Sequence, residues 1–330
     1  MRKVLIFQLF IIVSNIGFTQ TKYDSIFDET VNFVEENYAG YQDKTTNKND
    51  FYNYLLQTIR QDPINSSNDL RNNLDRYLAF FEDRHLKLND FDLAEFIASG
   101  KNNQYKSSEF KFDILNESTC YLKIPHFLSS SLVEKLINEN ISSISRKRNL
   151  IIDIRGNGGG NDNSYHKLLQ IIATNDIYLR NAKFLKTKAN WEEKYGKWDK
   201  TNEGKFVNLP WNKNKSEIFK SFTISGINEY PKRVAILVDR NVKSSGEMFV
   251  LSAKQSLKVK IFGENTAGLI DYSNVNQHEI LEDSLYLQYP MTKIIGIPIN
   301  SIDNHGIVPD FYLMDADQIG QILKYFEIWN

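Results

Sequence analysis

The chain has 330 residues, of which 41% are hydrophobic and 25% charged, as in an ordinary globular protein. At about 150 residues per domain, this length fits two domains. The 40 basic and 41 acidic residues give a net charge of −1, which argues against a protein that binds nucleic acid by neutralising phosphates. The single cysteine, Cys120, excludes an internal disulfide and a zinc site built from thiolates.

The first 20 residues have the pattern of a secretory signal peptide. Arg2 and Lys3 precede an apolar run from Val4 to Val13, and small and polar residues follow up to Gln20. The run is too short for a comfortable membrane span, and no cysteine directly follows it that could carry a lipid anchor. The alternatives are an uncleaved anchor or a buried first helix. We expect residues 1–19 to be removed and the mature protein to be periplasmic or secreted.

Residues from about 21 to 82 contain three apolar stripes with helical spacing. The stripes are Phe27, Val31, Val34 and Tyr38, then Phe51, Leu55 and Ile59, then Leu70, Leu74, Tyr77, Leu78 and Phe81. Asp62-Pro63 is a stop signal, and Ser66 or Ser67 can cap the third helix. We interpret the stripes as core packing and predict a helical cap domain over residues 20–100.

From about residue 108 strands and helices alternate. Strands are expected at Tyr121–Pro125, Leu150–Ile154, Val234–Val238 and Val259–Phe262, and helices at about 132–144, 245–257 and 317–326. Apart from Asp153, the segment Leu150–Ile154 is apolar, as in a strand that is buried on both faces. This order predicts an α/β catalytic domain with largely parallel strands over residues 101–330. The polar stretch from Lys186 to Lys215 has the character of an insertion without an assigned role.

A glycine-rich loop, Arg155-Gly156-Asn157-Gly158-Gly159-Gly160, follows the strand that ends at Ile154. It could bind a phosphate, form a simple tight turn, or present N–H groups to an oxyanion. The dinucleotide fingerprint is incomplete because Asn161 stands at its third glycine position, and no Gly-Lys-Ser/Thr follows. We therefore favour an oxyanion-binding loop.

The strand that ends at Val238 leads to Ser244-Ser245-Gly246-Glu247, where a helix is expected to begin. A serine at such a turn can be a nucleophile, because its hydroxyl is exposed and the next N–H can stabilise an oxyanion. Alternatively, Ser244 or Ser245 only caps the helix, and Glu247 completes a capping box. Taken alone, this segment favours the cap.

Five motifs in the chain resemble, in order, those of the tail-specific (C-terminal processing) serine peptidases. They are Phe81-Glu-Asp83-Arg-His85, Asp153-Ile-Arg155-x-Asn157-x-Gly159-Gly160, Ser244-x-Gly246-Glu247, Gly263-Glu-Asn-Thr-Ala-Gly268 and Gly306-Ile-Val-Pro309-Asp310. Each motif is weak alone, but five in order are a strong signal. The resemblance implies a crotonase/ClpP-like α/β core with a helical N-terminal cap, and hydrolysis of peptide bonds by a serine.

The resemblance also implies the nucleophile and the oxyanion donors. Ser244 matches the family's serine, and the amides of Ser245 and of Gly159 or Gly158 would hold the oxyanion. In the processing branch the base is a lysine downstream of the serine, but Leu269 stands at that position here.

The chain is more similar to the PDZ-less branch, related to the tricorn-protease core and the interphotoreceptor retinoid-binding protein repeats. The segment between His85 and Tyr121 is too short for a PDZ domain. In this branch a histidine before the core is the base and a downstream acid orients it, roles that match His85 and Asp303. Arg84 and Leu86 depart from the glycine and threonine that usually flank the histidine.

Two functions remain open. The first is an exported serine peptidase that acts on peptide or protein substrates through a Ser244 acyl-enzyme, with His85 as general base and Asp303 orienting it. The second is a catalytically inactive family member that binds a peptide or an apolar ligand in the same cleft. No metal is expected, because the other histidines lack metal-ligand spacing. No cofactor, nucleic acid or membrane partner is expected either.

Overall fold

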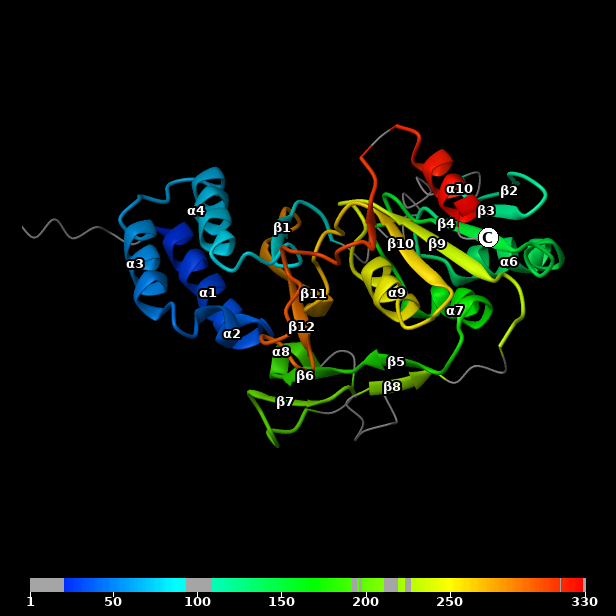
Figure 1. Ribbon diagram of the computed structural model, residues 1–330. Coiled ribbons are helices and arrows are strands. Elements are labelled where there is room, and N and C mark those ends of the chain that lie inside the picture. The colour runs from blue at the N-terminus through cyan, green and yellow to red at the C-terminus, as the bar shows by residue number, and fades with distance from the viewer. Residues whose placement is uncertain are drawn as a thin grey trace, which may run out of the picture.

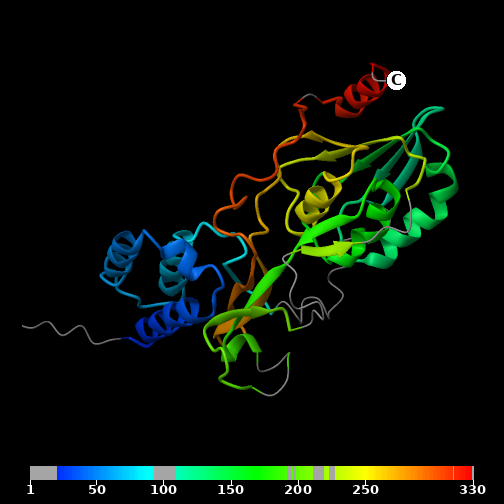
Figure 2. The same ribbon diagram turned by 60° about the horizontal axis from the view of Figure 1, so that its bottom comes forward.

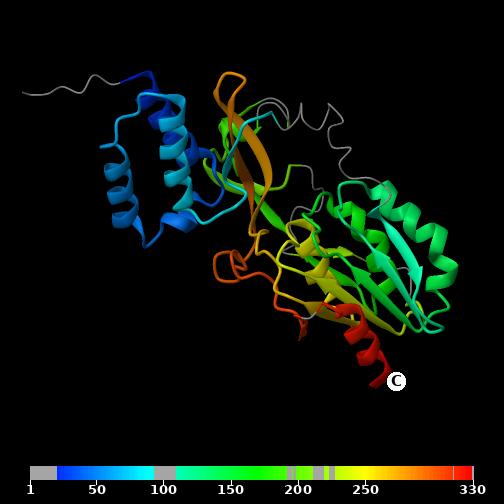
Figure 3. The same ribbon diagram turned by 90° about the horizontal axis from the view of Figure 1, so that it is seen from above.

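The computed structural model describes residues 21–92, 109–191, 195, 198–210, 219–222, 227–314 and 316–328. The predicted signal peptide lies outside these residues. A helical region stands at one end of the molecule, an α/β core at the other, and a second sheet between them (Figures 1 and 3). Within the described residues, no helix is both long and apolar enough to cross a membrane.

The helical region contains the three predicted helices and a short fourth one. They are α1 (Lys22–Asn37), α2 (Tyr41–Thr45), α3 (Asn49–Ile59) and α4 (Ser67–Ala79). The hydroxyl of Ser66 accepts a hydrogen bond from the Asp69 N–H and so caps α4, as predicted. The predicted stripes are buried except at Phe51, which is 59% exposed, and Leu55, which is only partly buried.

The second sheet was not predicted from the sequence. Its strands are β1 (Lys87–Asn89), β12 (Leu285–Ile294), β6 (Ala182–Lys186) and β7 (Lys205–Asn208) in spatial order, and β11 (Tyr272–Leu281) pairs with β12 as a hairpin. The short helix α8 (Lys188–Trp191) follows β6. The polar stretch that begins at Lys186 contributes β7 to this sheet, because β7 pairs with β6. A separate pair joins β5 (Ile177–Arg180) and β8 (Phe219–Phe222).

One hydrophobic cluster joins the helical region to this second sheet. It contains α1, α3 and α4 residues such as Val34 and Leu74, together with Phe184 of β6 and Leu287 of β12. The helices therefore share their core with strands that lie far along the chain. The division at residue 100 stays a prediction, and this cluster spans it.

The core sheet carries the predicted parallel strands. Its spatial order is β13 (Phe311–Tyr312), β10 (Val259–Gly263), β9 (Arg233–Val238), β4 (Asn149–Asp153), β3 (Thr119–Lys123) and β2 (Lys111–Ile114). All pairings from β13 to β3 are parallel, and β2 is antiparallel to β3. The mixed α/β class that the sequence predicts is thus confirmed.

Helices cover both faces of the core sheet (Figure 2). One face packs against α6 (Ser130–Ile144), α7 (His166–Ile172) and α9 (Ser245–Ala253), and the other against α10 (Gln318–Ile328). A 3₁₀ turn, η3 (Asp162–Tyr165), precedes α7. Along β4, Leu150 and Ile152 face the first group of helices, whereas Ile151 faces α10. This alternation explains the apolar run Leu150–Ile152, because every side chain of the strand is covered.

Candidate active site

The glycine-rich loop and the Ser244 turn lie side by side because β4 and β9 are parallel neighbours. Parallel strands end at the same edge of a sheet, and Asp153 of β4 and Leu237 of β9 are the last paired residues of the two strands. The Lys243 N–H donates to the Asn157 carbonyl at 3.0 Å, which ties the two loops together. Both motifs therefore lie at the same edge of the core sheet.

Ser244 has an unusual backbone conformation. Its φ is 52° and its ψ is −123°, a region that costs free energy for any residue with a Cβ. Within the described residues, its hydroxyl makes no hydrogen bond that caps α9. The Ser245 hydroxyl donates instead to the Gly160 carbonyl at 2.9 Å. Neither serine hydroxyl caps the helix, so the capping alternative does not hold.

Gly159 packs directly against Ser244. A Cβ at Gly159 would lie 2.8 Å from the Ser244 Cβ and 2.9 Å from the Lys243 carbonyl oxygen, and the φ of Gly159 is +98°. Both the close approach and the positive φ require glycine. The backbone of the glycine-rich loop at Gly159 therefore packs against Ser244 and helps to fix its position.

The oxyanion donors differ from the prediction at one position. The Gly159 N–H donates to Asn157 Oδ1 at 2.9 Å, so it is not available to a substrate oxygen. Within the described residues, the N–H groups of Ser245 and Gly158 donate no hydrogen bond. These two amides are therefore the candidates that remain.

We expect Gly159→Ala to lower turnover by roughly 10²-fold, because a displacement near 1 Å at the nucleophile can cost that much. The strained φ should also reduce the free energy of unfolding by about 1–2 kcal/mol. Gly156→Ala is a matched control, since Gly156 also has a positive φ, +78°, but a Cβ there would contact nothing within 4 Å. Equal loss of kcat in both folded variants would contradict a support role for Gly159.

His85 is held by its backbone and by one ring nitrogen. Its N–H donates to Asp83 Oδ1 at 2.8 Å, and the buried Asp83 also accepts from the Tyr38 hydroxyl at 2.8 Å. The Nδ1 of His85 lies 2.8 Å from the Tyr272 carbonyl oxygen. A carbonyl can only accept, so Nδ1 carries the proton and Nε2 is the basic nitrogen. Burial lowers the pKa of His85, mainly by disfavouring the imidazolium, although the Asp83 charge opposes this.

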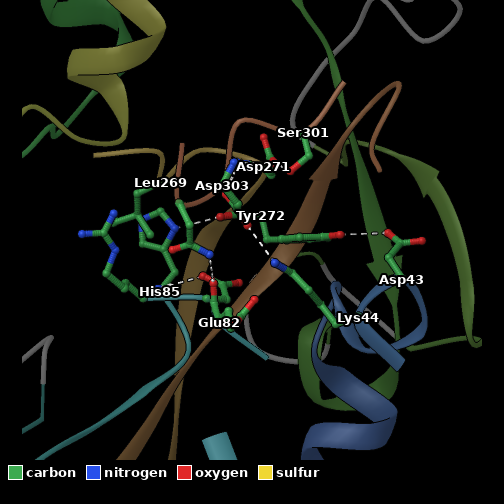
Figure 4. A network of polar contacts seen from close by, with 12 residues as sticks. Asp43, Lys44, Glu82, His85, Leu269, Asp271, Tyr272, Ser301 and Asp303 are labelled. Carbon is green, nitrogen blue, oxygen red and sulfur yellow. Dashed lines mark hydrogen bonds and ion pairs between the residues drawn. The ribbon is translucent and has the colours of Figure 1, made fainter. Parts of the chain in front are cut away.

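The expected hydrogen bond between Asp303 and the His85 ring is not found among the described residues. Asp303 Oδ2 accepts from Lys44 Nζ of α2 at 3.2 Å, and Asp303 Oδ1 accepts from the Asp271 N–H at 3.4 Å (Figure 4). Burial, followed by the nearby charges of Asp271 and Asp83, raises the pKa of Asp303 to about 7. The contact expected from the acid is made by the Tyr272 carbonyl, a backbone group that sequence motifs do not report.

The segments that carry His85 and Ser244 meet at Ala267. The Arg84 guanidinium donates to the Ala267 carbonyl, and the Ala267 N–H donates to the Val242 carbonyl at 2.9 Å. The residue before the histidine and the loop before the serine therefore contact the same position.

Glu247 joins three of the five motifs. Its fully buried carboxylate accepts hydrogen bonds from the Thr266 hydroxyl at 2.6 Å and from the N–H groups of Gly268 and Leu269 at 2.6 and 2.7 Å. The Thr266 hydroxyl accepts in turn from the Ile307 N–H at 2.7 Å. The glutamate therefore fixes the first turn of α9 to the segments at 263–268 and 306–310.

Comparison with known proteins identifies the class. The sequence pattern of Peptidase family S41 matches residues 118–313, more than half of the chain. The chain therefore belongs to peptidase family S41 and is a serine-type peptidase, as its resemblance to the tail-specific peptidases implies. The matched range contains Ser244 and Asp303, whereas His85 precedes it. Among curated proteins, no sequence matches the chain.

Solved structures share the fold over nearly the full chain. A crystal structure described as a putative peptidase from Parabacteroides merdae has a TM-score of 0.60 at 15% identity, covering 93% of this chain and 96% of its own. A lipoprotein from Streptococcus agalactiae has a TM-score of 0.55 at 20% identity, covering 95% of this chain and 99% of its own. The photosystem II D1 C-terminal processing protease has a TM-score of 0.51 at 12% identity, covering 92% of this chain and 97% of its own. At these identities the likeness concerns the fold alone.

Proposed function

We propose that the chain is an exported serine peptidase in which Ser244 is the nucleophile and His85 the general base. The observation that carries this proposal is the Ser244 turn: a strained serine with no capping role, next to an N–H group without an acceptor in the described structure. Export rests on the signal-peptide pattern of residues 1–19. The assignments to the crotonase/ClpP-like folds and to the PDZ-less branch are part of the same proposal.

The proposed reaction is acyl transfer to the serine and then to water. Ser244 Oγ attacks the peptide carbonyl while His85 Nε2 takes its proton, and the amides of Ser245 and Gly158 hold the oxyanion. The C–N bond breaks as the imidazolium returns the proton to the leaving amine. Water then attacks the acyl-enzyme by the same route and releases Ser244.

Asp303 has a positioning role in this proposal. It accepts from the N–H of Asp271, whose neighbour Tyr272 presents its carbonyl to His85 Nδ1. The carboxylate thus acts on the imidazole through the Asp271–Tyr272 backbone at the start of β11, and Lys44 supplies its counter-charge. Removing Asp303 should therefore cost less turnover than removing His85.

The pH dependence of stability tests the environment of Asp303. Its pKa of about 7 lies above the value of about 3.9 in an unfolded chain, so the folded state binds more protons between these values. The free energy of unfolding should therefore fall as pH rises from about 4 to 7, by up to roughly 4 kcal/mol from this group. We expect Asp303→Asn to flatten the fall, measured by urea unfolding at pH 4.5 and 8.

Asp28→Asn is the control for this measurement, because Asp28 forms an exposed ion pair with Arg60. It should leave the wild-type pH dependence in place. An unchanged slope in Asp303→Asn would show that this carboxyl does not titrate in the window.

The experiment that tests the function combines serine labelling with turnover. A fluorophosphonate probe should label the wild type and not Ser244→Ala, and a library of unstructured peptides should be cleaved by the wild type only. Equal labelling of both proteins would refute Ser244 as the nucleophile. Peptide binding without cleavage by the wild type would favour the inactive, ligand-binding alternative.

A further inference from the structure

The short helix α2 of the helical region contacts the start of β11, the strand whose first residue holds the His85 ring. Asp43 Oδ2 accepts a hydrogen bond from the Tyr272 hydroxyl at 3.1 Å (Figure 4). The same oxygen accepts from Lys293 Nζ at 2.9 Å. Tyr272 and Lys293 lie opposite each other in the β11–β12 pair, so their side chains leave the same face of the hairpin. Asp43 therefore binds to both strands at once.

These contacts are shielded from water. Tyr272 is 2% exposed, and the side chains of Asp43 and Lys293 are 15% and 19% exposed. An ion pair in such surroundings is screened less than one at the surface, and a hydrogen bond to a charged acceptor is stronger than one between neutral groups. The phenol of Tyr272 is thus held to α2 by a bond that water does not readily replace.

The next residue of α2 contacts the second group near the base. Lys44 Nζ donates to Asp303 Oδ2 at 3.2 Å and lies over the Tyr272 ring, 5.4 Å from its centre. The backbone fixes this junction as well, because the Ala39 N–H donates to the Pro290 carbonyl of β12 at 3.0 Å. Two adjacent residues of α2 thus reach Tyr272 and Asp303.

Tyr272 connects these contacts to the His85 ring. It is the first residue of β11, and its carbonyl oxygen lies 2.8 Å from His85 Nδ1. Its ring packs against Tyr38, with 5.8 Å between the ring centres. The Tyr38 hydroxyl donates to Asp83, which accepts from the His85 N–H. The helical region therefore fixes the side chain of the same residue whose carbonyl fixes the imidazole.

The place of the Tyr272 carbonyl decides which tautomer His85 adopts. A neutral imidazole carries its proton on either nitrogen, and the hydrogen bond made by one nitrogen selects the form. Only the form with the proton on Nδ1 leaves Nε2 free to accept the serine proton. If the first residue of β11 moves, the ring loses this selection even though His85 itself is unchanged.

We propose that Asp43 is a positioning residue for the base and that it acts through Tyr272. The inference rests on the proposed function, in which His85 is the base. Loss of the Asp43 contact should lower kcat and leave KM nearly unchanged, because the imidazole acts in the transition state and does not hold the substrate.

The tautomer of His85 is the readout that separates positioning from general stability. In protein with ¹⁵N-labelled histidine at pH 8, couplings between ring nitrogens and ring protons report which nitrogen carries the proton, and the His85→Gln spectrum assigns the signal. We expect the Nδ1–H form in the wild type and a shift toward the Nε2–H form in Tyr272→Phe and Asp43→Ala. On a cleaved peptide, kcat should fall by about tenfold to 10²-fold in both variants. Asp43→Asn keeps an oxygen acceptor and should lose less.

Tyr52→Phe is the matched control. It removes a phenol–carboxylate hydrogen bond of the same kind, from Tyr52 to Glu35 at 2.6 Å, within the helical region. It should lower the free energy of unfolding but keep the wild-type tautomer and kcat. Asp43→Ala and Tyr272→Phe should be less than additive in the double variant, because each removes the same contact.

Wild-type tautomer and kcat in folded Tyr272→Phe and Asp43→Ala would overturn the proposal, and so would equal changes in Tyr52→Phe. A lower kcat with an unchanged tautomer would also contradict it. If Asp43→Ala does not fold, Tyr272→Phe decides, since it removes one buried oxygen and keeps the ring. A tautomer shift in these variants of a protein that never cleaves a peptide would count against the proposed function and leave the contact through Tyr272 standing.

Discussion

Replacing His85 with alanine is expected to reduce peptide hydrolysis by at least about 10³-fold, while the protein stays folded. A positioned general base contributes roughly 10²–10⁴-fold, and here the imidazole serves in both halves of the reaction. The Tyr272 carbonyl selects the tautomer with Nε2 unprotonated, which is the form that can accept the serine proton. Initial rates on a cleaved peptide, with a thermal melt for each variant, provide the measurement.

The pH profile separates an imidazole base from a lysine base. Burial lowers the pKa of His85 below its usual 6.5, so kcat/KM should rise with pH through a limb below about 6.5. A lysine base would place the limb at more alkaline pH, because its usual pKa is about 10.4. Lys243→Ala is the control next to the nucleophile and should keep both rate and profile. Retained turnover in His85→Ala, with loss of turnover in a lysine variant, would show that the base is a lysine, as in the processing branch of the family.

The sequence predicted the core sheet well because its signals are local. The runs Leu150–Ile152 and Val234–Val238 are covered by helices on both faces, so each of their residues is apolar. The second sheet left no comparable signal. Its central strand β12 pairs with residues 87–89, 182–184 and 272–281, and it contains Pro290 and the buried polar residues Gln288 and Thr292. The alternation of Leu285, Leu287, Tyr289 and Met291 was the available signal for a strand.

In the candidate site, too, the local features were predictable and the long-range contacts were not. Ser244 and the glycine-rich loop each follow a buried strand, so the sequence predicted both the motif and its place at a strand end. The group that holds the His85 ring is a backbone carbonyl, which any residue at position 272 would supply. The partner of Asp303 is Lys44, which is 259 positions away in a helix of the other region. Contacts of this kind depend on how the second sheet joins the two regions, and that sheet was the part not predicted.

Replacing Glu247 with alanine should have the largest effect on stability. The carboxylate is fully buried and accepts three hydrogen bonds, so its removal leaves three donors without an acceptor inside the protein: the N–H groups of Gly268 and Leu269 and the O–H of Thr266. Each buried donor left unpaired costs about 1–3 kcal/mol, which gives a total of roughly 3–5 kcal/mol after local relaxation. Because Glu247 lies in the first turn after Ser244, turnover should be lost with it.

Glu247→Gln tests whether the two carboxylate oxygens act as acceptors. Oε1 receives Thr266 and Gly268 and Oε2 receives Leu269, whereas an amide can accept through only one of its two heavy atoms. The amide variant should therefore lose roughly 1–3 kcal/mol in urea unfolding, less than the alanine variant. Glu229→Gln is the control, since Glu229 is 77% exposed and its ion pair with Lys232 should contribute at most about 1 kcal/mol. If Glu247→Gln were as stable as the wild type, the carboxyl would be protonated in the folded protein, and its role would be packing rather than acceptance of these hydrogen bonds.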